Sequence, residues 1–345
     1  MDRVSVPTMA ADATSAVAAA PAPAGGALVA AENLSVHFPV ARRAQRAVLK
    51  AVRNVSLGIA RGEVLGLVGE SGSGKSTLGL ALLRLAPITE GTVRFDGEDI
   101  THLSRQALQP YRRRMQIVFQ DPYSALDPRQ TVGDALAEPL AIHGLGASAR
   151  DRRARVDELL TMVGLTPQHA RRYPHEFSGG QRQRIGGARA RALEPELIVA
   201  DEPVSALDVS IQAQILALLR DLRARLRLTL LFVSHDLAVV RYLSDRVAVM
   251  YLGRIVEIAP SDALYRRPRH PYTRALLASV PARTPGAARA HAVLSGDLPS
   301  PLNPPSGCAF RTRCPHALPA CAEAVPELRT VSAGHVKACI RDDID

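Results

Sequence analysis

A glycine-rich segment, residues 69–77 with the sequence Gly-Glu-Ser-Gly-Ser-Gly-Lys-Ser-Thr, could bind the phosphates of a nucleotide. It follows an apolar run (residues 63–68) that predicts a strand, and the apolar spacing of residues 75–85 predicts a helix after it. Glycines in this position let backbone N–H groups turn toward phosphate oxygens at the start of the helix. Lys75 is then expected to reach the β- and γ-phosphates, and Ser76 to bind Mg²⁺. The candidate phosphate contacts are Gly69, Ser71, Gly72, Gly74, Lys75, Ser76 and Thr77.

Two acidic residues, Asp201 and Glu202, follow a second apolar run at residues 197–200. A carboxylate at the end of such a strand can bind Mg²⁺ directly or through water, and Asp201 is the candidate. The next carboxylate, Glu202, could take a proton from a water that attacks the γ-phosphate, or orient that water. The glycine-rich loop and the acidic pair together predict a site that hydrolyses a nucleoside triphosphate.

These motifs, taken in order along the chain, resemble those of the ATP-binding cassette (ABC) ATPases. Gln120 is similar to the glutamine of the family's Q-loop, and residues 177–181, Phe-Ser-Gly-Gly-Gln, resemble its signature sequence. Residues 205–208, Ser-Ala-Leu-Asp, resemble the D-loop, and His235 resembles the switch histidine that follows a strand.

The resemblance implies a nucleotide bound between two subunits. It implies ATP and Mg²⁺ as ligands, with Ser76, Gln120 and Asp201 near the metal and Lys75, Gln120, Glu202 and His235 as the catalytic set. In the family, the signature Ser and Gly contact the γ-phosphate bound to the opposite subunit, so Ser178 and Gly180 would serve a site on another chain. The further candidate nucleotide contacts are Gln181 and Asp208, and Phe38 as the aromatic residue that stacks on adenine.

The order of the elements predicts an α/β fold. Continuous apolar strands at residues 197–200 and 229–233 indicate a sheet that is covered on both faces. Residues 121–192 are Arg-rich with a helical pattern, which indicates a helical insert. The resemblance implies a P-loop NTPase of the ABC type, with a mixed core sheet, an antiparallel β subdomain, a helical subdomain and a cysteine-bearing C-terminal extension. The expected divisions are a disordered Ala/Pro-rich tail (1–30), an ATPase domain (31–260, helical subdomain about 121–192) and a C-terminal region (261–345).

Three further segments resemble one branch of the family, the dipeptide and oligopeptide importers. They are residues 118–129, 203–211 and 270–277, and the cysteine-bearing tail points to the same branch. Pro-Tyr after Gln120 resembles the second of that branch's two ATPase subunits. The resemblance implies a paralogous ATPase or a second copy of this chain as the dimer partner. It also implies two transmembrane permease subunits, an extracytoplasmic solute-binding protein and a place at the cytoplasmic face of the plasma membrane. Dipeptides, oligopeptides, glutathione and nickel all remain open as the solute.

Four cysteines, Cys308, Cys314, Cys321 and Cys339, lie in the last forty residues with five, six and seventeen residues between them. Disulfides are disfavoured in a cytosolic ATPase, and zinc sites usually contain closer pairs of cysteines. Four thiolates can also hold a [4Fe–4S] cluster. Related importer subunits contain one in this region, so the resemblance favours the cluster over zinc and over free or structural thiols.

Composition argues against other kinds of protein. The 345 residues carry a net charge of +10, but the Arg residues are scattered rather than gathered in a stripe, so we expect no nucleic-acid partner. No apolar run approaches the roughly 20 residues needed to span a bilayer. The start of the chain favours a disordered tail over a signal peptide. The alternatives to an importer subunit are a soluble ABC ATPase acting on nucleic acid or translation, or a nucleotide-binding scaffold without enzymatic activity.

One pair of residues departs from the family. The helix after the signature sequence carries Gly187 and Arg191 where relatives usually have bulky aliphatic residues. Positions 187 and 191 share one face of a helix, and an Arg side chain leans toward the N-terminus. We therefore expect Arg191 to cover the space that Gly187 leaves open.

Overall fold

The computed structural model describes residues 26–42, 45–121, 126–205, 208, 212–214, 216–217, 219–220, 223, 227–279 and 296–344. Most of the expected N-terminal tail, Tyr123 after the Q-loop, and two residues of the D-loop (206 and 207) lie outside these ranges.

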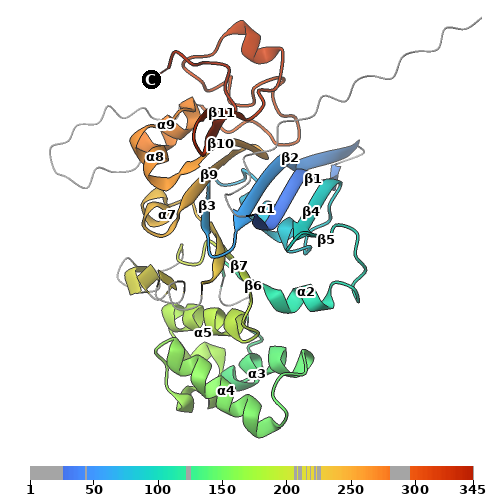
Figure 1. Cartoon of the computed structure of the whole chain (residues 1–345), viewed down its shortest axis with the longest axis vertical. Coiled ribbons are helices and arrows are strands. Elements are labelled where there is room, and N and C mark those ends of the chain that lie inside the picture. Colours follow the sequence, from blue (N-terminus) through green and yellow to red (C-terminus); the bar gives the residue numbers. More distant parts are fainter. Residues whose placement is uncertain are drawn as a thin grey trace, which may run out of the picture.

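The core is a mixed sheet of eight described strands in the order β11-β12-β10-β9-β3-β8-β7-β6 (Figure 1). The strands β6, β7, β8, β3 and β9 run parallel, whereas β10, β12 and β11 continue the sheet in antiparallel pairs. Every residue of β3 and β8 is buried, which confirms that this sheet is covered on both faces. The bounds are β3 (Val64–Val68), β6 (Met115–Val118), β7 (Leu197–Asp201), β8 (Thr229–Val233), β9 (Arg246–Tyr251), β10 (Arg254–Pro260), β11 (Arg329–Ser332) and β12 (His335–Lys337).

A second, antiparallel sheet has the order β2-β1-β4-β5. Its strands are β1 (Ala27–Arg42), β2 (Gln45–Ala60), β4 (Glu90–Phe95) and β5 (Glu98–Asp99). Helix α1 (Lys75–Leu82) packs in one core with both sheets, through Leu78 and Leu82. Strand β1 begins at Ala27, so residues 27–30 belong to this sheet rather than to the tail expected at residues 1–30.

The helical part lies at the opposite end of the molecule from the C-terminal region and has a core of its own (Figure 1). It contains α3 (Val132–Ile142), α4 (Ala149–Met162), two short 3₁₀ turns η1 (Pro167–Arg171) and η2 (Pro174–Glu176), and α5 (Gly179–Arg191). Helix α5 also packs against the main sheet, because Ala190 belongs to the core around β8 while Ile185 belongs to the helical core. The short helices α2 (Gln109–Arg114) and α7 (Leu237–Leu243) lie against β6 and β3 of the main sheet, respectively.

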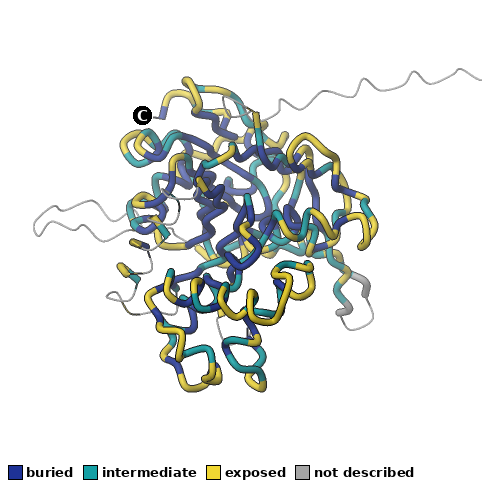
Figure 2. Tube along the Cα trace, turned by 60° about the horizontal axis from the view of Figure 1, so that its bottom comes forward, coloured by how far each residue is buried: buried dark blue, intermediate teal, exposed yellow. Residues whose placement is uncertain are grey.

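The C-terminal residues contain more regular structure than their sequence indicates. They form α8 (Ser261–Arg266), α9 (Pro271–Ala278), the turn η3 (Pro319–Ala322) and the strands β11 and β12. Strand β12 pairs with β10 through Glu257 and Lys337, so this region extends the main sheet. Figure 2 shows buried segments passing from the core into this end of the molecule. Phe310 is buried there against Tyr251 of β9 and Tyr272 of α9.

Candidate nucleotide-binding site

A cavity of about 640 Å³ lies over the glycine-rich loop. Side chains from β2, the end of β6, the loops after β7 and β8, the β9–β10 turn and the C-terminal region surround it. The lining residues are Leu49, Lys50, Ala51, Ser71, Gly72, Gly74, Lys75, Ser76, Thr77, Gln120, Glu202, His235, Leu252, Gly253 and Pro301.

The glycine-rich loop is wrapped around the Lys75 side chain. Its Nζ donates to the carbonyl oxygens of Gly69 (2.9 Å) and Glu70 (3.0 Å), and the residue is 5% exposed. Burial lowers the pKa of Lys75, and the nearby carboxylates of Glu202, Asp201 and Glu70 oppose that shift. Gly74 precedes the helix with φ 103°, and a Cβ there would lie 2.2 Å from the carbonyl oxygen of Ala51. Only glycine fits this close approach between the loop and β2.

Ser76 lines the cavity, and Asp201, which is not among the lining residues, lies directly beside it. The Ser76 hydroxyl donates to Asp201 Oδ1 at 3.0 Å. Burial raises the pKa of Asp201, as does the charge of Glu202, whereas the Ser76 hydrogen bond and Lys75 lower it. A hydroxyl beside a carboxylate supplies hard oxygen ligands of the kind Mg²⁺ prefers.

Glu202 is the centre of a three-residue cluster. Its Oε2 accepts from Gln120 Nε2 at 3.2 Å and lies 3.1 Å from His235 Nδ1. Neighbouring parallel strands β6, β7 and β8 bring these residues together, because each residue follows the carboxyl end of its strand. Glu202 itself has a φ of 45°, a left-handed conformation that non-glycine residues adopt at a cost and that clusters at functional sites.

The residues that resemble the family's signature sequence, 177–181, are all described by the structure, and none of them lines this cavity. Ser178 caps the N-terminus of α5: its Oγ accepts from the N–H of Gln181, and the Gln181 side chain accepts from the N–H of Ser178. Gly180 is buried in the first turn of α5. Asp208 is exposed, and its carbonyl accepts from the N–H of Gln212 at 2.9 Å.

Phe38 is also outside the set of lining residues. It is half-buried against the core, and its cross-strand partner Leu49 lines the cavity instead. Stacking of Phe38 on adenine therefore stays a prediction.

Several residues of the cavity wall carry no local signal in the sequence. Leu49 and Ala51 lie within strand β2, and Gly253 lies in the turn between β9 and β10. Pro301 comes from a Pro-rich segment more than 220 positions after the glycine-rich loop, and no spacing rule connects the two.

The four cysteines are free thiols that influence each other electrostatically. Burial raises the pKa of Cys308 to about 11, and it also raises that of Cys314. In the part of the chain that the structure describes, no group of three or more His, Cys, Asp or Glu side chains is arranged to hold a metal ion. No helix of the described residues is long and apolar enough to cross a bilayer.

Comparison with known proteins agrees with this geometry. Residues 52–205 match the family described as ABC transporter, and residues 256–321 match the oligopeptide/dipeptide transporter, C-terminal region. A Brucella ovis protein named as a peptide import ATP-binding protein is 58% identical over 92% of this chain and 98% of its own length. The oligopeptide transport ATP-binding protein AppF of Bacillus subtilis is 54% identical over 84% of this chain and 89% of its own.

Among solved structures, the ATP-binding cassette MJ0796 as a dimer bound to ADP and Pi superimposes with a TM-score of 0.62. It is 33% identical and covers 68% of this chain and 98% of its own. The predicted α/β cassette fold with a cysteine-bearing C-terminus is confirmed. The chain is an ATPase that belongs to the ATP-binding subunits of ABC transporters, in the group that carries the oligopeptide/dipeptide transporter C-terminal region.

Proposed function

We propose that this chain hydrolyses ATP–Mg²⁺ between two cassettes to power the import of dipeptides, oligopeptides or a related solute. The names of its relatives support a peptide-type importer, and a dimeric relative with ADP and Pi supports the paired arrangement. The position of Ser178 and Gly180 outside their own chain's cavity also supports it. A signature loop that does not line its own chain's cavity is free to contact the nucleotide of a partner, which would be either a paralogous ATPase or a second copy of this chain.

The candidate site residues take the following roles in this proposal. Lys75 and the N–H groups of Ser71, Gly72, Gly74, Ser76 and Thr77 would bind phosphates, and Ser76, Asp201 and Gln120 would hold Mg²⁺. Glu202 would orient or deprotonate the attacking water, with His235 and Gln120 fixing its carboxylate. Ser178, Gly180, Gln181 and Asp208 would act across the dimer interface. Positioning and charge would then carry phosphoryl transfer, as in other P-loop ATPases.

The observation that carries this proposal is the convergence of Gln120 and His235 on one oxygen of Glu202 beside the glycine-rich loop. The variant Glu202→Gln is expected to bind ATP as the wild type does and to lose turnover by at least about 100-fold, because a neutral amide cannot act as a base. Glu98→Gln, an exposed position in β5, is the control. Turnover above a tenth of the wild-type rate in Glu202→Gln, measured as phosphate release, would contradict the role of Glu202.

A surface groove next to Gln120 supports a permease partner. Phe119, Ile142 and Gly186 line it, together with Glu138 and Arg189. Ile142 is 61% exposed and Phe119 41%, so the groove presents two large apolar side chains to a partner. We propose that a short cytoplasmic helix of each permease subunit docks here, so that motion at Gln120 is transmitted to it. The protein would then lie peripherally at the cytoplasmic face of the plasma membrane, with an extracytoplasmic binding protein delivering the solute. Specificity for the solute would reside in those partners.

We also propose that residues 31–260 act as the ATPase domain, with the helical subdomain at about 121–192, and residues 261–345 as the C-terminal region. Separate family matches to residues 52–205 and 256–321 support this division.

Within the C-terminal region, we propose that the four thiols hold a [4Fe–4S] cluster. They are mutual electrostatic neighbours, and backbone N–H groups of Phe310 and His316 lower the pKa of Cys308 and Cys314 respectively, against the effect of burial. The N–H of Leu318 donates to Cys321 Sγ at 3.4 Å. Such N–H···S bonds surround iron–sulfur ligands and tune their potential. As they stand, the sulfurs are not arranged as a ligand group, so binding would require them to close together.

A further inference from the structure

An ion pair connects the C-terminal region to the glycine-rich loop. Arg313 Nη1 donates to both carboxylate oxygens of Glu70, at 3.0 and 2.9 Å. The side chain of Arg313 is only 6% exposed and that of Glu70 24%, so the pair is largely shielded from water. Removing one partner of a shielded ion pair strongly destabilises a protein, because the remaining charge is desolvated and unpaired.

The same glutamate is held at its backbone on both sides. Its N–H donates to the hydroxyl of Tyr272 in α9 at 2.9 Å, and its carbonyl accepts from Lys75 Nζ at 3.0 Å. Burial raises the pKa of Tyr272, which keeps the hydroxyl neutral. A continuous chain of hydrogen bonds therefore runs from Arg313 through Glu70 to Lys75.

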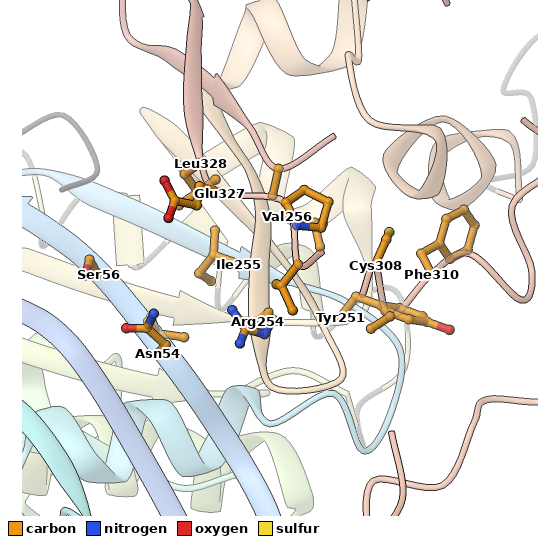
Figure 3. Close-up of a pocket in the computed structure, with 15 residues that line it drawn as sticks. Asn54, Ser56, Tyr251, Arg254, Ile255, Val256, Cys308, Phe310, Glu327 and Leu328 are labelled. Atoms are coloured by element: carbon orange, nitrogen blue, oxygen red, sulfur yellow. The ribbon is translucent and has the colours of Figure 1, made fainter. Parts of the chain in front are cut away.

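Arg313 lies next to a tightly packed cluster of aromatic side chains. Tyr251, Tyr272 and Phe310 contact one another with ring centroids 4.7 to 5.3 Å apart, and the Arg313 guanidinium lies 6.0 Å from the centre of the Tyr251 ring. Figure 3 shows Cys308 and Phe310 beside Tyr251, at a cavity of about 160 Å³ between the C-terminal region and the strands β9 and β10. The aromatic cluster fixes the start of the cysteine-bearing segment on β9.

Two residues of the C-terminal region also reach the nucleotide cavity. Pro301 is part of its wall. Leu298 Cδ2 would lie 3.9 Å from a Cβ at Gly72, so its side chain is next to the glycine-rich loop. The C-terminal region thus approaches this loop at Glu70, at Gly72 and at the mouth of the cavity.

We propose that the C-terminal region completes the ATP site, and that Arg313 is a positioning residue that fixes the glycine-rich loop through Glu70. Without this contact, the glycine-rich loop is more mobile in the ATP-free protein. ATP binding must then order the loop, and this entropic cost reduces the affinity for ATP. The contacts described for the Arg313 side chain are with Glu70 and Tyr251, and none is with the catalytic cluster of Gln120, Glu202 and His235. Loss of Arg313 therefore weakens ATP binding more than it slows the chemical step. The effect is reciprocal, so ATP also stabilises the packing of the C-terminal region.

The test compares Arg313→Gln with Arg311→Gln in the full chain. Arg311 is two residues away, and in the described contacts its side chain donates only to Ser306, which makes it a matched control. We expect Arg313→Gln to raise the Kd and KM for ATP about tenfold, within the usual range of coupling between sites, and to change kcat less than about threefold. Arg313→Lys is expected to recover part of the affinity, because a lysine keeps the charge but loses the planar donor geometry.

Glu70→Gln tests the same link from the loop side, and it keeps the proposal testable if Arg313→Gln fails to fold. If Arg313 acts through Glu70, the double variant Arg313→Gln/Glu70→Gln binds ATP no more weakly than the worse single variant. Three results would overturn the proposal: ATP affinity in Arg313→Gln equal to that of Arg311→Gln, a fall in kcat at unchanged KM, or additive losses of affinity in the double variant.

Discussion

Helix α5 contains a packing defect that can be corrected, and the gain can be worked out from the structure. A Cβ placed on Gly187 would meet no atom within 4 Å. The space is a cavity of about 40 Å³ whose walls include Val118, Ile198 and Leu230. Arg191 lines the same cavity, as the sequence predicted, but it does not fill it. The residue is 5% exposed, burial lowers the pKa of its guanidinium, and its Nε lacks a hydrogen-bond partner among the described residues.

The double variant Gly187→Ile/Arg191→Leu should increase the free energy of unfolding for three reasons. Replacing a helical glycine by isoleucine gains about 0.5 kcal/mol of helix propensity. Burying the isoleucine side chain contributes about 1.5–3 kcal/mol. Removing an unsatisfied buried donor contributes about 1–3 kcal/mol. The lower ends of these ranges give a gain of about 3 kcal/mol in the free energy of unfolding, or roughly 4 °C in melting temperature for a chain of 345 residues.

The assay is thermal unfolding followed by circular dichroism, for the double variant, both single variants and Gly187→Ala. Gly187→Ala is the control for helix propensity, and it should gain no more than about 1 kcal/mol. Gly187→Ile alone should gain little, because Arg191 still occupies part of the space. The two changes should therefore couple by more than about 1 kcal/mol. A double variant that melts at or below the wild-type temperature would refute the reasoning and mean that the pair is adapted to its surroundings.

Two further predictions concern the C-terminal region. Burial lowers the pKa of His270 from 6.5 to about 4. At a pH between these two values, His270 is protonated in the unfolded chain and neutral in the folded chain. The stability of the fold therefore decreases as the pH falls through this range. From pH 7 to pH 5 the free energy of unfolding falls by about 2 kcal/mol from this group. The variant His270→Asn, whose side chain can still cap α9, should reduce this pH dependence of stability, measured by urea unfolding at each pH. An unchanged pH dependence would rule out His270 as its source. Protein purified without oxygen should be brown, with absorption at about 400 nm that Cys321→Ser abolishes. Colourless, iron-free protein prepared in this way would exclude the cluster.

Local signals predicted much of the fold and of the site. Strands β7 and β8 are continuous apolar runs, and the polar residues that follow them, Glu202 and His235, meet because parallel strands end at one edge of the sheet. Other features had no local signal. Strands β11 and β12 have only four and three residues; β12 depends on pairing with β10, and β11 depends on pairing with β12. Glu70 and Arg313 are 243 positions apart, so neither hydrophobic periodicity nor a motif could connect them.

Helix α5 connects the stability argument with the proposed function. Its N-terminus presents Ser178 and Gly180, and its later residues pack on both the helical core and the main sheet. The cavity at Gly187 lies on the side that faces β7 and β8, so contact between the helical part and the main sheet is reduced at this point. Fewer dispersion contacts at a seam lower the cost of moving one part against the other. If the helical part must turn to present Ser178 to ATP on a partner, the defect would ease that motion at the expense of stability.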